Sequence, residues 1–485
     1  MTAVAAALEP SFLAALAAVP VEAWSSWFCD RMQPFSEPMA PQRTLVATFP
    51  LPGAMGHAAL CVLETTVGTG VGTLHQAAIR RWPGDAPTGA EVLYREAGPD
   101  GAPLWTLASA WADADLRAWL REALAAGASI RNGGWEWLAA PERPAASKAG
   151  DGSSSQVVGR RHDVVLFEPR AVAIVYRRMT RGGHPELDII RHLERVPSVG
   201  IATRLLGSAI IRAPNGQRTA SAIMEGLATG SATVRSVLVA RLRRALDGDP
   251  SLQAVALDDV RAVGVATREL HAALGRPFEQ GVLAGAVAAT VRDVGSWVAR
   301  AWNSLSDATA AFTALPNPDP ALAAALEALP GKLQQFGAAA EIAPGLVHRI
   351  HGSLRLDAVL MTPPRTLHIV EFDGDAYLPD AERLSPQSPL RDAARLLISL
   401  AEAAAEAAHL AGRDEKAFVI AWLWEREARK AYLEGYGTGG GALHALLAIF
   451  ELEYASQLLL DSLGTHGLPA VVPSHTLQRL SRTIV

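Results

Sequence analysis

The feature that most constrains the fold is a change of pattern near residue 233. Before it, from residue 157, the apolar residues fall in short β-type runs around one helical stretch. The β runs span residues 164–167, 172–176, 208–211 and 219–224, and the helical spacing covers 185–193. After it the chain has helical spacing almost throughout, broken by β-type residues only from 346 to 375. We therefore predict an α+β chain with a β-rich N-terminal lobe and a mainly helical C-terminal lobe.

The remaining segments complete the predicted domain plan. Residues 1–140 mix strand-like runs with an amphipathic stretch near 110–125, which is typical of a small α+β cap. Residues 141–156 are rich in proline, glycine and serine and form the clearest linker. The plan is thus a cap at 1–140, a linker at 141–156, an N-lobe at 157–233 and a C-lobe at 234–485.

Charge and cysteine content exclude several classes of partner. A net charge of -5 and a pI near 6.2 give no positive surface for nucleic acid or an anionic membrane. Apolar stretches stop short of the roughly 20 residues that span a bilayer, and no basic residue precedes Arg31 as a secretory signal requires. Two cysteines, Cys29 and Cys61, cannot make a disulfide framework. We expect a cytoplasmic protein with no nucleic-acid or membrane partner.

Five ordered segments carry a resemblance to a known family. Residues 349–360 read R-I-H-G-S-L-R-L-D-A-V-L, and nine residues later 369–375 read I-V-E-F-D-G-D. These strings resemble the catalytic loop and metal segment of the maltokinase branch of aminoglycoside-phosphotransferase-like kinases, R-I-H-G-D-L-H-x-x-Q-V-L and I-D-F-E-G-E. Residues 382–392, 450–454 and 175–188 are similar to further family segments. The resemblance implies a two-lobed protein-kinase-like fold, ATP and Mg²⁺ as cofactors, and a maltose-like sugar as substrate.

The catalytic-loop positions depart from the family pattern. Where the family has the aspartate that orients the sugar hydroxyl and accepts its proton, this chain has Ser353, a neutral hydroxyl. Asp357 is the alternative base in the loop, or else a solvated or capping carboxylate. The family's amide ligand to the metal is replaced by Ala358, whose methyl group cannot bind Mg²⁺.

The metal segment keeps carboxylates. Glu371 stands at the family's metal-binding aspartate, and Asp373 and Asp375 follow at alternating positions. On a strand all three would share one face, so we predict that Glu371 and Asp373 hold a divalent ion. The alternative is an exposed acidic turn around Gly374.

The phosphate-binding positions of the N-lobe have also changed. Ile174 occupies the place of the family's lysine, and no lysine occurs between residues 157 and 329. Arg161 and Arg178 are the arginines that would have to hold phosphate instead. Asp188 matches the acidic partner of the missing lysine, or is a surface residue.

Several family residues are retained. The resemblance gives His351 the role of a packed residue of the catalytic loop, and Arg391 and Asp392 brace that loop or line the sugar pocket. The losses at Ile174, Ser353 and Ala358 favour an impaired kinase that acts by binding, as a partner or sensor in maltose, trehalose or α-glucan metabolism. An active maltokinase, and a scaffold for a glycan or trehalose-metabolism enzyme, are the alternatives.

Overall fold

The computed structural model divides the chain into two compact units. Unit 1 comprises Met1–Arg191, Thr203–Thr229 and Ala376–Asp380, and unit 2 comprises His192–Ala202, Gly230–Asp375 and Ala381–Val485. The structure describes residues 7–28, 42–66, 72–142, 154–158, 162–168, 171–180, 184–196, 201–226, 230–277, 285–375, 378, 380–412, 415–437, 441–464 and 470–484.

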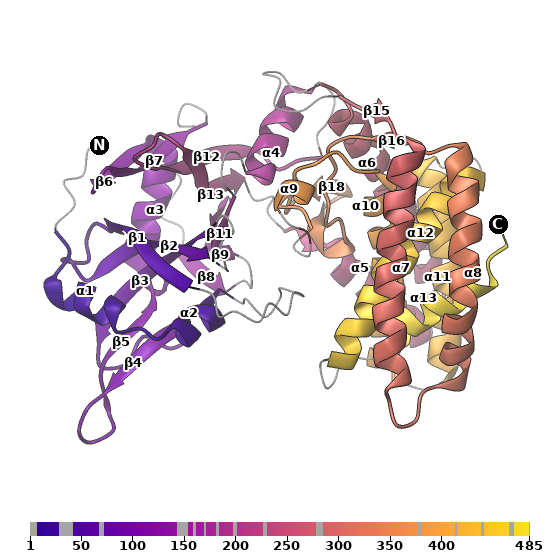
Figure 1. Ribbon diagram of the computed structural model, residues 1–485, viewed down its shortest axis with the longest axis horizontal. Helices are drawn as coiled ribbons and strands as arrows, with labels where there is room; N and C mark the ends of the chain where they lie inside the picture. The colour runs from indigo at the N-terminus through magenta and orange to yellow at the C-terminus, as the bar shows by residue number, and fades with distance from the viewer. Residues whose placement is uncertain are drawn as a thin grey trace. The chain divides into compact units, whose positions relative to one another are not determined.

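Unit 1 contains two antiparallel sheets (Figure 1). The first has the order β1-β2-β3-β5-β4, with β11 paired to β3, and the second has the order β6-β7-β12-β13-β10-β9-β8. The strands are β1 (Gln42–Pro50), β2 (Ala58–Thr66), β3 (Thr73–Pro83), β4 (Val92–Ala97), β5 (Pro103–Ser109), β6 (Ala128–Asn132), β7 (Trp135–Pro141), β8 (Ser154–Val158), β9 (His162–Phe167), β10 (Ala171–Tyr176), β11 (Arg178–Met179), β12 (Leu205–Arg212) and β13 (Arg218–Gly226).

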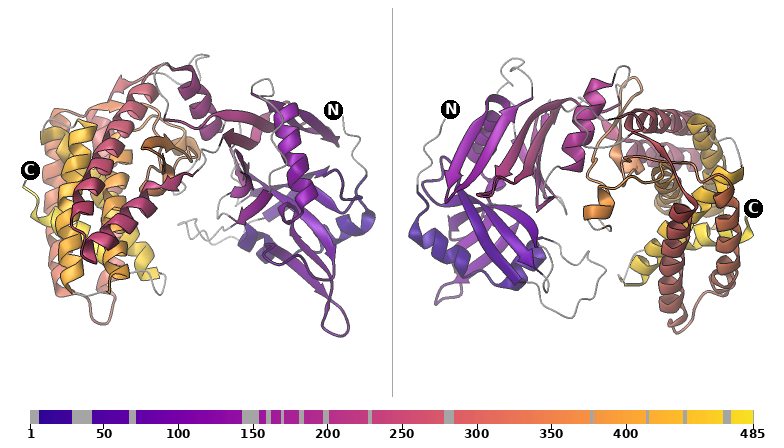
Figure 2. Two further views of the ribbon diagram at one scale, coloured as in Figure 1. Left: turned by 180° about the vertical axis from the view of Figure 1, so that it is seen from behind. Right: turned by 45° about the horizontal axis from the view of Figure 1, so that its top comes forward.

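Helices cover the sheets of unit 1 by burying apolar faces. Helices α1 (Pro10–Ala17) and α2 (Val21–Trp27) bury Phe12, Leu16 and Trp24 against β2, β3 and β5. Helix α3 (Ala114–Ala126) packs across the second sheet (Figure 2). Its start is fixed by Asp113, whose carboxylate accepts a hydrogen bond from the Asp115 N–H.

The predicted strand, strand, helix, strand, strand order is confirmed by β9, β10, α4 (Pro185–Arg195), β12 and β13. The predicted separation of cap and N-lobe is wrong, because β7 of the cap pairs with β12 of the lobe and β8 begins inside the predicted linker. Arg177 adds a second connection: its guanidinium donates to Asp163 at 2.7 Å and to the Trp27 carbonyl at 2.8 Å. Cap and N-lobe therefore fold as one unit.

A buried histidine in this unit predicts sensitivity to acid. His75 of β3 is 5% exposed, and burial together with nearby Arg43 and Arg178 lowers its pKa from 6.5 to about 3. Because the unfolded chain then binds a proton that the folded chain excludes, stability falls as pH drops below 6.5, by up to about 1.4 kcal/mol per pH unit. We expect His75→Gln to show a smaller loss of melting temperature between pH 7 and pH 5 than the native chain. Equal losses in differential scanning calorimetry would contradict this.

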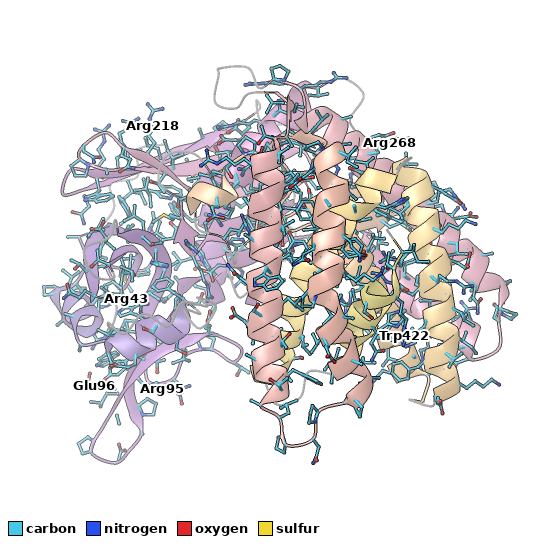
Figure 3. The ribbon with its side chains drawn as sticks, turned by 45° about the vertical axis from the view of Figure 1, so that its right-hand side comes forward. Arg43, Arg95, Glu96, Arg218, Arg268 and Trp422 are labelled. Atoms are coloured by element: carbon cyan, nitrogen blue, oxygen red, sulfur yellow. The ribbon has the colours of Figure 1, made fainter. Side chains whose placement is uncertain are left out.

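Unit 2 is mainly helical, as predicted. Its helices are α5 (Val234–Leu246), α6 (Ser251–Leu274), α7 (Val291–Thr313), α8 (Pro320–Ile342), α9 (Asp380–Arg383), α10 (Leu390–Leu410), α11 (Glu415–Tyr436), α12 (Gly441–Gly464) and α13 (Val471–Arg482). Short strands β14 (Ala232–Thr233), β15 (Val287–Ala288), β16 (Leu346–Val347), β17 (Val359–Thr362) and β18 (Thr366–Ile369) accompany them. Helices α7 and α8 lie side by side (Figure 3). Trp422 of α11 stacks on His475 of α13, with ring centroids 3.9 Å apart.

Among the described residues, one helix segment is long and apolar enough to cross a bilayer. It is Leu443–Leu463 of α12, and 72% of its most apolar window is buried inside the molecule. Burial of that kind is typical of the core helix of a helical domain.

Candidate functional site

The segment that resembles a catalytic loop links β16 to β17 in unit 2, and α10 holds it in place. The carboxylate of Asp392 accepts hydrogen bonds from the N–H groups of His351 at 2.9 Å and Gly352 at 2.8 Å, and His271 Nε2 lies 3.1 Å from it. Burial alone would raise the pKa of Asp392, but the bond to His271 and the charges around it hold that pKa below its usual value. An ionised, buried carboxylate thus fixes the loop.

His351 is held in a neutral form. Its Nε2 lies 2.9 Å from the carbonyl of Val370, which can only accept, and its Nδ1 accepts from the N–H of Ser353 at 3.3 Å. Burial lowers the pKa of His351, which agrees with that pattern. Each ring nitrogen is therefore engaged by the backbone of the site.

Two glycines allow the segments 349–360 and 369–375 to touch. Gly352 has φ 84° and Gly374 has φ 82°, both in the left-handed region. A Cβ at Gly352 would lie 3.0 Å from Gly374 Cα, and one at Gly374 would lie 2.7 Å from Arg383 Cγ. A side chain at Gly352 would therefore force the two segments apart, and one at Gly374 would displace the side chain of Arg383.

A guanidinium lies beside Ser353. Nη1 of Arg395, on α10, is 3.5 Å from Ser353 Oγ, and Nη2 donates to the carboxylate of Asp375. The guanidinium also stacks over the ring of Tyr454, 4.2 Å from its centroid. Burial alone would lower the pKa of Arg395, but Asp375 raises it above its usual value, so the side chain carries a fixed positive charge.

Sequence reasoning missed Arg395. The signal was helical spacing, because Arg395 lies four residues after Arg391 and three after Asp392, on the same face of a predicted helix. Its role depends on Asp375 and Tyr454, which are distant in sequence, so the spacing alone did not reveal it.

The acidic segment after β18 does not form the predicted strand. The strand ends at Ile369, Glu371 is exposed with φ 66°, and residues 372–373 form a turn that leaves Asp373 and Asp375 buried at 4% and 5% exposure. The prediction that the three carboxylates share one face is therefore wrong, because the backbone turns between them.

The described residues do not fit a preformed magnesium site. Within the described ranges, no group of three or more histidine, cysteine, aspartate or glutamate side chains is placed to hold a metal ion. Asp375 is engaged by Arg395, and the buried methyl group of Ala358 has no ligand atom. Metal binding by Glu371 and Asp373 stays a prediction.

Asp357 lies in an ion-pair network. Its carboxylate is 3.4 Å from Nη1 of Arg235 and 3.9 Å from Nη2 of Arg355, and its side chain is 46% exposed. Glu402 of α10 shares both arginines, at 3.0 Å each. The network orients Asp357 toward α5 and α10.

Arg391 is buried in the interior of unit 2, where both of its terminal nitrogens are engaged. It donates to Glu453 at 2.9 and 3.2 Å and to the Tyr454 hydroxyl at 3.3 Å, and its side chain is 1% exposed. These contacts, like those of Asp392, join α10 to the loop and to α12. Such contacts are those expected of residues that brace the loop. The other predicted role of Arg391 and Asp392, lining a sugar pocket, stays a prediction.

The N-lobe positions lie in unit 1. Ile174 is buried in β10, opposite Val164 of β9 and Ile223 of β13. Arg178 lies on β11 opposite His75, and Asp188 is in the first turn of α4. Arg161 lies outside the described residues.

A buried carboxylate near β10 was also missed. The hydroxyl of Tyr176 donates to Glu186 of α4 at 2.8 Å, and Glu186 is 1% exposed. The alternation of β10 places Tyr176 on the same face as Ile174. This residue pair connects β10 to α4.

The fold resembles that of solved sugar kinases, although no family model matches the chain. A glucosamine kinase in complex with glucosamine, ADP and inorganic phosphate aligns with a TM-score of 0.60 and 18% identity, over 95% of this chain and 99% of that one. Two other crystal forms of glucosamine kinase give TM-scores of 0.63 at 19% identity, covering 95% and 93% of this chain and 99% and 96% of theirs. The likeness shows a two-lobed, kinase-like α+β fold.

Proposed function

We propose that this chain is a homologue of sugar phosphotransferases with an impaired transfer centre, and that it acts by binding its ligand. It would act as a partner or sensor in maltose, trehalose or α-glucan metabolism. The observation that carries the proposal is the contact between Arg395 and Ser353. A proton acceptor is needed at this point of the loop, and the side chains there are a hydroxyl and a guanidinium.

The neighbouring groups support the same conclusion. Asp375 is bonded to the permanently charged Arg395, so its carboxylate is already engaged by a cation. Loss of a general base typically costs about 10²- to 10⁴-fold in rate. The apolar residues Ala358 and Ile174 remove further polar contacts that phosphoryl transfer uses.

The second candidate is an active ATP-dependent sugar kinase that makes maltose 1-phosphate or phosphorylates a related sugar. The partial exposure of Asp357 favours it, because that carboxylate belongs to the loop itself. The glucosamine kinase likeness adds glucosamine as a second sugar to test and a nucleotide as cofactor. This candidate needs Mg²⁺ to be recruited with the nucleotide.

A coupled assay with ATP, Mg²⁺ and either maltose or glucosamine separates the two candidates. Kinases typically turn over about 1–100 times per second. Because the general base is missing, we expect turnover at or below about one hundredth of such a rate. Calorimetry on the same preparation should still detect sugar binding. Ordinary turnover that Asp357→Asn abolishes would overturn the proposal and establish the second candidate.

A further inference from the structure

The hydrogen-bonding character of the site is the reverse of what removal of a proton from a sugar hydroxyl requires. A carboxylate in the catalytic loop only accepts hydrogen bonds, which suits a hydroxyl that must lose its proton. Ser353 and Arg395 instead present an O–H and N–H donors to the same point. Donors at close range, one of them charged, match an oxyanion.

The positive charge is held in a fixed position. Arg395 is constrained by Tyr454 on its face and by Asp375 at Nη2, and its side chain is 11% exposed. Its contact with Ser353, at 3.5 Å, lies at the outer limit of a hydrogen bond, so little is lost when a ligand oxygen replaces it. The guanidinium is thus preorganised for an anionic group.

The nearby carboxylates are already matched. Asp375 is paired with Arg395, and Asp392 is used by the loop N–H groups and His271. Asp373 is buried at 4% exposure. Relative to the family motif the site has lost one negative charge at residue 353 and has a cation 3.5 Å from that position.

We propose that Ser353 and Arg395 form a subsite for the phosphate group of a phosphorylated sugar. This inference rests on the proposed function, because a chain that acts by binding needs a ligand that its altered loop can recognise. A chain with this subsite would prefer sugar phosphates, which are the products of sugar kinases, to the neutral sugars that are their substrates. The hydroxyl of Ser353 and Nη1 of Arg395 donate to two phosphate oxygens.

The test is calorimetry on the full chain with α-glucose 1-phosphate, glucose and inorganic phosphate. We expect the sugar phosphate to bind at least about tenfold more tightly than either of the others, as hydrogen bonds to charged groups allow. Equal affinity for glucose or for inorganic phosphate would overturn the proposal. The coupled assay does not depend on these affinity ratios. Ordinary turnover in that assay would refute the proposed impairment of the transfer centre, whereas equal affinities would refute only the phosphate subsite.

Variants give a second readout. Ser353→Asp restores the negative charge, and Arg395→Met with Asp375→Asn removes the ion pair without leaving a lone buried carboxylate. Each should weaken binding of the sugar phosphate by about tenfold or more while glucose binding changes little. The control Arg426→Met, at an exposed position of α11, should bind as the native chain does. Tighter binding of the sugar phosphate by Ser353→Asp would also overturn the proposal.

Discussion

Replacing Arg391 by methionine should lower the unfolding free energy of unit 2 by about 3–5 kcal/mol. Arg391 and Glu453 are each 1% exposed, and their bonds of 2.9 and 3.2 Å join α10 to α12. Burial alone would lower the pKa of Arg391, but Glu453 and Tyr454 raise it above its usual value, so the guanidinium stays charged. The variant would leave a buried carboxylate without its main partner.

The measurement is hydrogen exchange of α12 peptides during urea unfolding, which reports on unit 2 separately. The double variant Arg391→Met with Glu453→Met should recover most of the loss, because no lone charge remains. Arg426→Met on α11 serves as the surface control and should change stability by less than about 0.5 kcal/mol. A single variant as stable as this control would show that the ion pair contributes little.

Rebuilding the transfer centre should produce the largest change in activity. Under the proposed function, Ser353→Asp, Ala358→Gln and Ile174→Lys would together supply a base, a metal-ligand oxygen and a phosphate-binding cation. We expect sugar phosphorylation at least about 10²-fold above the native chain, since general-base catalysis alone contributes that much. Ser353→Asp alone should gain little, because a base can act on the sugar hydroxyl only when the metal ion and the phosphates are also held in place.

The matched control replaces aspartate by asparagine in the same triple variant. Asparagine has the same shape without the charge, so its activity should stay at the native level. Radiolabelled transfer from ATP to maltose and glucosamine is the measurement, with melting curves to verify folding. Equal activity of a folded triple variant and the native chain would show that these three positions do not explain the impairment.

Local patterns predicted the elements of both lobes because their signals lie within short stretches of sequence. In β9, buried and partly buried residues alternate along the strand, and α4 begins at Pro185, which is suited to a first helical turn. The β break within the C-lobe was likewise found from β-type residues near 359–369. Such features need no knowledge of distant partners.

The features that sequence reasoning missed or placed wrongly depend on long-range contacts and backbone turns. The pairing of Ser208 with Ala140 joins segments that composition had assigned to different domains. The positive φ of Glu371 turns a chain whose alternating acids suggested a strand. The ion pair between Arg395 and Asp375 joins residues from a helix and a loop that no single motif contains.

Because the cap and the N-lobe share a sheet, removing the cap would also affect the lobe. Removing the residues before β8 would leave one edge of β12 unpaired and open to aggregation. It would also remove Trp27 and Glu91, which accept hydrogen bonds from Arg177, and leave that arginine with Asp163. The cap is therefore not a detachable module. The strand order β7-β12-β13-β10 links the cap, through shared backbone hydrogen bonds, to the strand that carries Ile174.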